Sequence, residues 1–242
     1  MPTSATSPRP DPAAAGPRRR ASRAIGVSRV RRLAAVAAAL AAATALAACS
    51  SGNASVDVSG GNSSGMRGTE LSAPIAKPDV HLTDAANQPY DLRASTTGKL
   101  TLLYFGYTHC PDVCPTTMAD IAAALGSVSP DVRAKTDVVF ISSDPTRDTP
   151  AVLGRWLRQF NPSFVGLTGD VKTIDKVANT VGVPLEPPQR QADGTYTVEH
   201  GAQVIAFAPD GQARYVYLAG TQVADYVHDL PLLVKPAAAG AA

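Results

Sequence analysis

Beyond its first 48 residues, the chain lacks the excess of positive charge that binding to nucleic acid requires. The formal net charge is +2, but residues 1–48 hold eight arginines against one acidic residue. Residues 49–242 are left with 14 basic and 19 acidic side chains. Because Lys and Arg provide the attraction to a phosphate backbone, we expect no nucleic-acid partner.

The chain also lacks compositional extremes, an internal repeat and a long hydrophobic run. It is 45% hydrophobic and 17% charged over 242 residues, which excludes collagen-like and wholly disordered chains and fits one domain with appendages. The uncharged apolar run at 33–48 has 16 residues, short of the about 20 that a membrane-spanning helix needs.

This arginine-rich start and short apolar run predict a secretory signal peptide over residues 1–48. The run ends in Leu46-Ala47-Ala48-Cys49, which resembles a bacterial lipobox, so Cys49 is the expected lipidation site. The alternatives are a signal peptide with an incidental cysteine, or an uncleaved anchor. Ser, Gly and Asn dominate the stretch that follows, which predicts a flexible tether over 49–70. We expect the protein at the extracytoplasmic face of the cell membrane, with a frayed tail over 236–242.

Residues 71–235 show the periodicities of an α/β domain. Short apolar runs predict buried strands, and apolar residues at i, i+3, i+4 and i+7 predict helices between them. Pro209-Asp210-Gly211 predicts the turn of a late hairpin, and residues 81–92 predict a small hairpin at the domain's edge. The expected strands are 100–105, 138–141, 164–167, 203–207 and 215–218; the expected helices are 115–126, 150–160, one capped by Asp170, and 221–230. Alternating strands and helices indicate one sheet covered on both faces.

Two of the three cysteines, Cys110 and Cys114, follow the first long strand and lie at the start of the first helix. An open α/β sheet commonly has its site there. Pro115 suits the first helical position, and helix amides should lower the thiol pKa. A structural disulfide and two inert thiols are the simpler interpretations, but so short a loop gains little stability from a bridge. Two soft thiolates could instead hold Cu(I) or Zn(II), or act as a redox pair.

The flanks of these cysteines resemble the Sco/SenC family. The resemblance rests on Phe105-Gly-Tyr-Thr-His-Cys-Pro-Asp-Val-Cys-Pro115, on Ile141-Ser-Ser-Asp-Pro-Thr-Arg-Asp-Thr-Pro150, and on a histidine before the late hairpin. It implies a thioredoxin-like fold, here with an N-terminal β-hairpin extension. It also implies a copper chaperone for the Cu A centre of cytochrome c oxidase, with the oxidase's copper-binding subunit as partner.

The same resemblance implies copper ligation by Cys110, Cys114 and His200. Imidazole is a suitable third ligand type beside two thiolates. Among the other histidines, we expect His81 and His228 to be solvated, and His109 to diverge from the sulfurs while tuning their acidity. Turn and capping chemistry is the simpler explanation of Asp144 and Asp148, and support of the copper ligands by Asp144 is the alternative.

Two functions remain open on the sequence. The first is a metallochaperone, and the second is a thiol–disulfide oxidoreductase that keeps the recipient's cysteines reduced, which would call for a thiol reductase partner. The spacing of Cys110 and Cys114 argues against simple thioredoxin chemistry, which uses two intervening residues. A third class, a peroxiredoxin-type peroxidase, needs Thr three residues before its reactive cysteine. Position 107 is Tyr, which argues against this class.

Replacing Cys49 tests the predicted lipid anchor. Cys49→Ala removes the thiol that would accept the lipid, so we expect an unlipidated protein, either uncleaved or shed from the membrane. Mass spectrometry of the mature N-terminus measures this. A wild-type protein with an unlipidated N-terminus downstream of residue 49 would contradict the assignment.

Overall fold

The computed structural model describes residues 65–186, 189–190, 196–197 and 201–235. The predicted signal peptide, Cys49, most of the predicted tether, His200 and the tail 236–242 lie outside these residues. Within the described part of the chain, no helix has the length and apolar character needed to cross a membrane.

An eight-stranded mixed sheet forms the centre of the domain, in the order β1-β10-β9-β4-β5-β6-β2-β3. Strands β4, β5 and β6 are parallel neighbours, and the remaining pairs are antiparallel. The strands are β1 Thr69–Ala76, β2 His81–Asp84, β3 Pro89–Asp91, β4 Leu100–Gly106, β5 Thr136–Ser142, β6 Val165–Thr168, β9 Val204–Phe207 and β10 Gln212–Tyr217. A separate two-stranded pair joins β7 (Gln189–Arg190) and β8 (Tyr196–Thr197).

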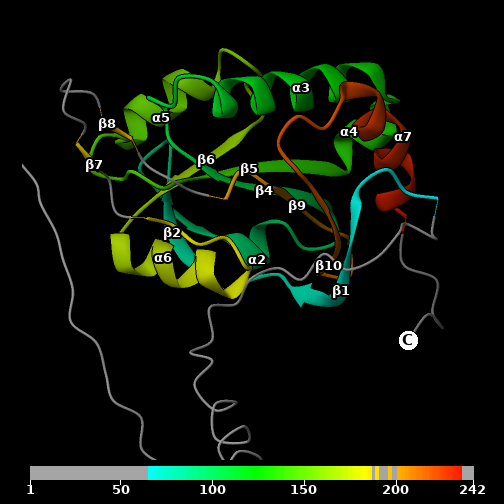
Figure 1. Ribbon diagram of the computed structural model, residues 1–242, viewed down its shortest axis with the longest axis horizontal. Helices are drawn as coiled ribbons and strands as arrows, with labels where there is room; N and C mark the ends of the chain where they lie inside the picture. Colours follow the sequence, from blue (N-terminus) through cyan, green and yellow to red (C-terminus); the bar gives the residue numbers. More distant parts are fainter. Residues whose placement is uncertain (1–64, 187–188, 191–195, 198–200, 236–242) are drawn as a thin grey trace, which may run out of the picture. The chain divides into compact units, whose positions relative to one another are not determined.

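Helices cover both faces of this sheet, as the alternation of strands and helices predicts (Figure 1). Helices α3, α4, α5 and α7 lie on one side, and α2 and α6 on the other. Their bounds are α2 Leu92–Ser95, α3 Val113–Ser127, α4 Pro130–Ala134, α5 Pro150–Leu157, α6 Val171–Thr180 and α7 Val223–Leu233.

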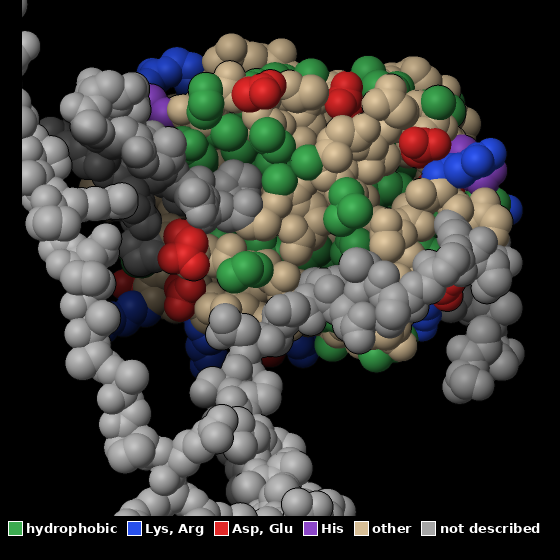
Figure 2. Space-filling model, viewed as in Figure 1, with side chains coloured by type: hydrophobic (Ala, Val, Ile, Leu, Met, Phe, Trp, Pro, Cys, Tyr) green, Lys and Arg blue, Asp and Glu red, His purple; other side chains and the backbone are tan. Residues whose placement is uncertain are grey.

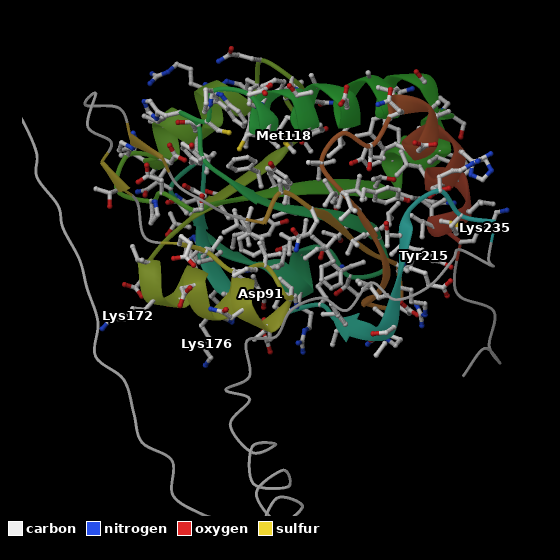
Figure 3. All side chains as sticks on the ribbon, in the orientation of Figure 1. Asp91, Met118, Lys172, Lys176, Tyr215 and Lys235 are labelled. Carbon is white, nitrogen blue, oxygen red and sulfur yellow. The ribbon has the colours of Figure 1, made fainter. Side chains whose placement is uncertain are left out.

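Strand β4 divides its buried side chains between the two faces. All seven of its residues are buried, and successive side chains of a strand point to opposite faces. Leu102 and Tyr104 pack with α3 and α5, whereas Leu103 and Phe105 pack with α6. In Figure 3, Met118 of α3 points toward the sheet.

Helix α6 is amphipathic, as the spacing of its apolar residues predicts. Asp170 caps its first turn by accepting a hydrogen bond from the Thr173 amide at 3.0 Å, and Ile174 packs against the sheet. Lys172 and Lys176 point away from the sheet (Figure 3), and basic side chains line that lower edge in Figure 2.

Four structural features were not predicted from the sequence. Strand β1 adds to the far edge of the sheet beside β10, helix α2 follows β3, helix α4 precedes β5, and β7 pairs with β8. Helix α3 begins two residues earlier than expected, at Val113, so Pro115 is its third residue and not its first. The predicted edge hairpin is confirmed as β2 and β3, which extend the sheet beside β6.

A buried carboxylate attaches the start of β1 to α7. Asp229 is fully buried and accepts hydrogen bonds from the amides of Arg67 (2.9 and 3.0 Å) and Gly68 (2.8 Å). The Tyr217 hydroxyl donates to it at 2.9 Å, and His228 Nδ1 lies 2.7 Å from it. Residues just before the expected domain start at 71 are therefore part of the packed structure.

Replacing this carboxylate should destabilise the domain. Asp229→Asn keeps the side chain's shape but turns one acceptor oxygen into a donor, which leaves at least one buried partner without an acceptor. We expect a loss of about 2–3 kcal/mol in the free energy of unfolding, measured by urea denaturation. Asp225→Asn, one turn earlier on α7, should cost less than about 1 kcal/mol. Equal losses in the two variants would contradict the role given to Asp229.

Candidate functional site

The cysteine pair lies where β4 ends and α3 begins. After Gly106 the chain turns, and the Cys110 amide donates to the Tyr107 carbonyl at 3.1 Å. Helix α3 starts at Val113, which makes Cys114 its second residue. The neighbouring strand β5 ends alongside, where the Ser143 amide donates to the Gly106 carbonyl at 2.7 Å. The two sequence motifs therefore meet at the carboxyl ends of two parallel strands.

Both cysteines are reduced, and they differ in exposure. Cys110 is half-buried and Cys114 is fully buried. The Cys114 amide donates to Cys110 Sγ at 3.4 Å, which orients the first sulfur over the first turn of the helix. The Tyr104 hydroxyl lies 3.7 Å from Cys114 Sγ as a donor. The pair is thus held by backbone and side-chain hydrogen bonds without a covalent link.

Glycine at position 106 allows this close packing. A Cβ there would lie 2.9 Å from Cys114 Sγ and 2.7 Å from the ring of Tyr104. Real Cβ atoms do not approach other heavy atoms so closely, so any larger residue would displace the buried thiol.

The pKa of the Cys114 thiol is raised, contrary to the expectation that helix amides would lower it. The hydrogen bond between the two thiols raises it most, and burial raises it further. A backbone hydrogen bond at Tyr107 and the Tyr104 hydroxyl lower it by less. Burial likewise raises the pKa of Tyr104. Cys114 is therefore a thiol at neutral pH, and a metal ion that binds its sulfur must displace the proton.

Asp148 is the carboxylate that bonds directly to the cysteine loop. It is fully buried, and it accepts hydrogen bonds from the Thr108 amide at 3.0 Å and the Thr108 hydroxyl at 2.6 Å. The Ser142 hydroxyl donates to it at 2.7 Å from the end of β5. The sequence assigned Asp148 only to a turn, because burial of a loop carboxylate leaves no periodic signal.

Asp144, the predicted supporting residue, reaches the cysteine loop only through another side chain. Its buried carboxylate accepts a hydrogen bond from Arg147, whose guanidinium lies 5.9 Å from the centre of the Tyr107 ring. Tyr107 precedes the Thr108 segment, so Asp144 supports the cysteine loop through Arg147.

His200, the predicted third ligand, lies outside the described residues. The next residue, Gly201, donates to the Pro184 carbonyl at 3.3 Å. Of the other histidines, His109 is exposed beside Cys110, and His228 contacts Asp229.

One further group could hold a cation. Asp79, His81 and Asp91 have ligand atoms within 4.8 Å of one another, the one such set in the part of the chain that the structure describes. Asp79 and His81 are exposed and Asp91 is partly buried, and Arg93 already pairs with Asp79 at 3.7 Å. This group belongs to the edge hairpin and its approach, and we assign it no role.

The difference between the two thiols can be measured by alkylation. Iodoacetamide should modify Cys110 faster than Cys114 between about pH 7 and pH 9, because the thiolate is the nucleophile and Cys114 is both buried and protonated. Peptide mass spectrometry measures the two rates. Cys110→Ala should speed the reaction at Cys114, since it removes the hydrogen bond that raises its pKa most. Equal rates in the folded wild type, as expected after unfolding, would contradict the assignment.

Comparison with solved structures places this fold among Sco proteins. Copper-bound ScoI of Bradyrhizobium japonicum aligns with a TM-score of 0.59 and 34% identity, covering 65% of this chain and 99% of that one. Apo Sco1 of Thermus thermophilus aligns with a TM-score of 0.62 and 33% identity, covering 72% and 99%. The thioredoxin-like fold implied by the sequence is confirmed.

Curated relatives and a family model agree with the structures. A putative copper-binding protein of Stutzerimonas stutzeri is 33% identical over 57% of this chain and 67% of its own length. The mitochondrial SCO1 homologue of Homo sapiens is 37% identical over 48% of this chain and 38% of its own length. The match thus spans about two thirds of the bacterial relative and well under half of the human one. The SCO1/SenC family model matches residues 69–235, and the chain belongs to that family.

Proposed function

We propose that the protein is a lipid-anchored, extracytoplasmic metallochaperone that delivers copper to the Cu A centre of cytochrome c oxidase. The observation that carries the proposal is the reduced pair Cys110–Cys114, held at the carboxyl end of β4 with Cys110 half-buried and Cys114 fully buried. It stands in a chain whose relatives include a putative copper-binding protein and a copper-bound ScoI.

The donor set fits copper as cargo. Thiolate sulfur is a soft ligand that suits Cu(I), and imidazole suits copper in either oxidation state. Cys110, Cys114 and His200 would supply two sulfurs and one nitrogen. The raised pKa of Cys114 makes binding release a proton, so affinity should increase as the pH rises.

The proposed lipid anchor would keep the domain at the membrane that also holds its recipient. Cys49 would carry the lipid, and the residues between it and β1 would act as the tether. The proposed partner is the copper-binding subunit of the oxidase, as the family resemblance implies.

A second candidate function is thiol–disulfide exchange. The half-buried Cys110 and the fully buried Cys114 are arranged as an attacking and a resolving thiol would be. In this role the protein would reduce the recipient's cysteines, and Cys110–Cys114 would end as a disulfide that a partner reductase must reopen.

Copper binding by the full-length chain tests the proposed ligands. In a Cys49→Ala background, which leaves two thiols, the reduced protein should bind one Cu(I), and Cys110→Ser/Cys114→Ser should bind essentially none. His200→Ala should weaken binding by at least about tenfold, since imidazole completes the metal site. Competition with a Cu(I) chelator under anaerobic conditions measures all three, with His81→Ala as the matched histidine control.

The same His200 and cysteine substitutions, made with Cys49 intact for the assembly assay, separate the two functions. His200→Ala should leave the redox potential of the dithiol near the wild-type value, because thiol exchange needs no imidazole ligand. Loss of copper binding together with loss of oxidase assembly would support metal delivery. Assembly that survives in His200→Ala but fails without the cysteines would assign the protein to thiol reduction. If His200→Ala changes neither copper binding nor assembly, His200 is not a ligand.

A further inference from the structure

Three hydrogen bonds to Asp148 determine where the hydroxyl hydrogen of Thr108 lies. A carboxylate only accepts hydrogen bonds, so the 2.6 Å contact between Thr108 Oγ1 and Asp148 Oδ1 uses the single hydroxyl hydrogen of Thr108. The Thr108 amide and the Ser142 hydroxyl donate to the other oxygen of the same carboxylate. Thr108 Oγ1 therefore has only lone pairs left to offer to a third group.

That third group is the imidazole of His109. Its Nδ1 lies 3.1 Å from Thr108 Oγ1, within hydrogen-bond distance. Because the hydroxyl hydrogen already points to Asp148, Nδ1 must be the donor and must carry the ring hydrogen. In a neutral imidazole the other nitrogen, Nε2, then has an available lone pair, which is the form that ligates metals.

His109 is the most exposed of the three side chains that could ligate copper in this segment. The His109 side chain is 55% exposed, Cys110 is half-buried, and Cys114 is fully buried. An ion arriving from solvent therefore meets His109 and Cys110 before Cys114. In the described part of the chain, His109 does not join the two sulfurs in a set of ligand atoms lying within 4.8 Å of one another. This placement suits a temporary ligand and not a resident one.

We propose that His109 is a transfer ligand, held by Thr108 and Asp148 with Nε2 available, and that it binds copper together with Cys110 during loading and release. The inference rests on the proposed copper function and adds one residue to the route by which copper enters and leaves the site. Copper gains a bond to Nε2, which loses no proton, and a bond to Cys110 sulfur, whose proton passes to solvent. The bond to Nε2 then breaks as Cys114 sulfur binds and releases its proton.

Nitrogen NMR of the copper-free protein tests the hydrogen bonds that connect Asp148, Thr108 and His109, called here the hydrogen-bond chain. The chain has four histidines, so selective ¹⁵N-histidine labelling of the full-length chain gives few signals to assign. At alkaline pH, where the ring is neutral, His109 should be mainly the Nδ1–H tautomer. Thr108→Val keeps the side chain's shape but removes the acceptor, so this preference should be lost.

Ser142→Ala is the control for this measurement. It also removes one hydrogen bond to Asp148, but it does not touch His109, so the tautomer should be unchanged. A wild-type His109 found mainly as the Nε2–H tautomer would overturn the hydrogen-bond chain, whatever the protein does with copper.

Exchange kinetics test the transfer role. In the Cys49→Ala background, His109→Ala should leave the equilibrium Cu(I) affinity near the wild-type value. It should slow copper exchange with a chelator by about tenfold or more in both directions, on the scale that loss of a group beside a metal site produces. His81→Ala, a remote exposed histidine, should change neither quantity.

The outcomes separate this inference from the function on which it rests. Unchanged exchange rates in His109→Ala would overturn the transfer role while leaving the copper site intact. An affinity that falls as far as the rates would make His109 a resident ligand and would also overturn it. A wild-type protein that binds no copper would refute the proposed function itself, a result that the NMR measurement does not depend on.

Discussion

The parallel pairing of β4 with β5 is the constraint on which the candidate site depends. The two strands pair without a break from Leu100 opposite Thr136 to Gly106 opposite Ser142. Their carboxyl ends therefore coincide, and the loops that follow them are forced into contact. The Ser143 amide, bonded to the Gly106 carbonyl, extends the pairing by one step into those loops. A shift of register would separate the cysteines from the acidic motif.

Buried polar groups give the junction of these loops its shape. Asp148 and Asp144 are both buried, and each reaches the segment before Cys110, Asp148 directly and Asp144 through Arg147. A buried charge is costly unless its hydrogen bonds are satisfied, so the loop conformation that satisfies Asp148 is strongly favoured over others. As a consequence the half-buried Cys110 is held beside the buried Cys114, whose thiol proton is hard to remove.

The sequence predicted the elements that local patterns encode. Periodic apolar residues located the central strands and the long helices, and Asp170 caps α6 as expected. Strand β1 escaped prediction because it is an edge strand with a partly exposed face, and the short helix α4 has too few turns to show a period. The raised pKa of Cys114 could not be predicted either, since it arises from burial and from a thiol neighbour.

By itself, the sequence determined the fold class, the family and the identity of the two cysteines, because spacing and flanking residues are properties of the chain. Only the tertiary structure decided which of the two thiols is exposed and which acidic residue bonds to their loop. It also brought Thr108, whose hydroxyl lies 3.1 Å from His109 Nδ1, to a carboxylate 40 positions away along the chain. Burial and hydrogen-bond partners come from packing between distant segments, which no local pattern in the chain records.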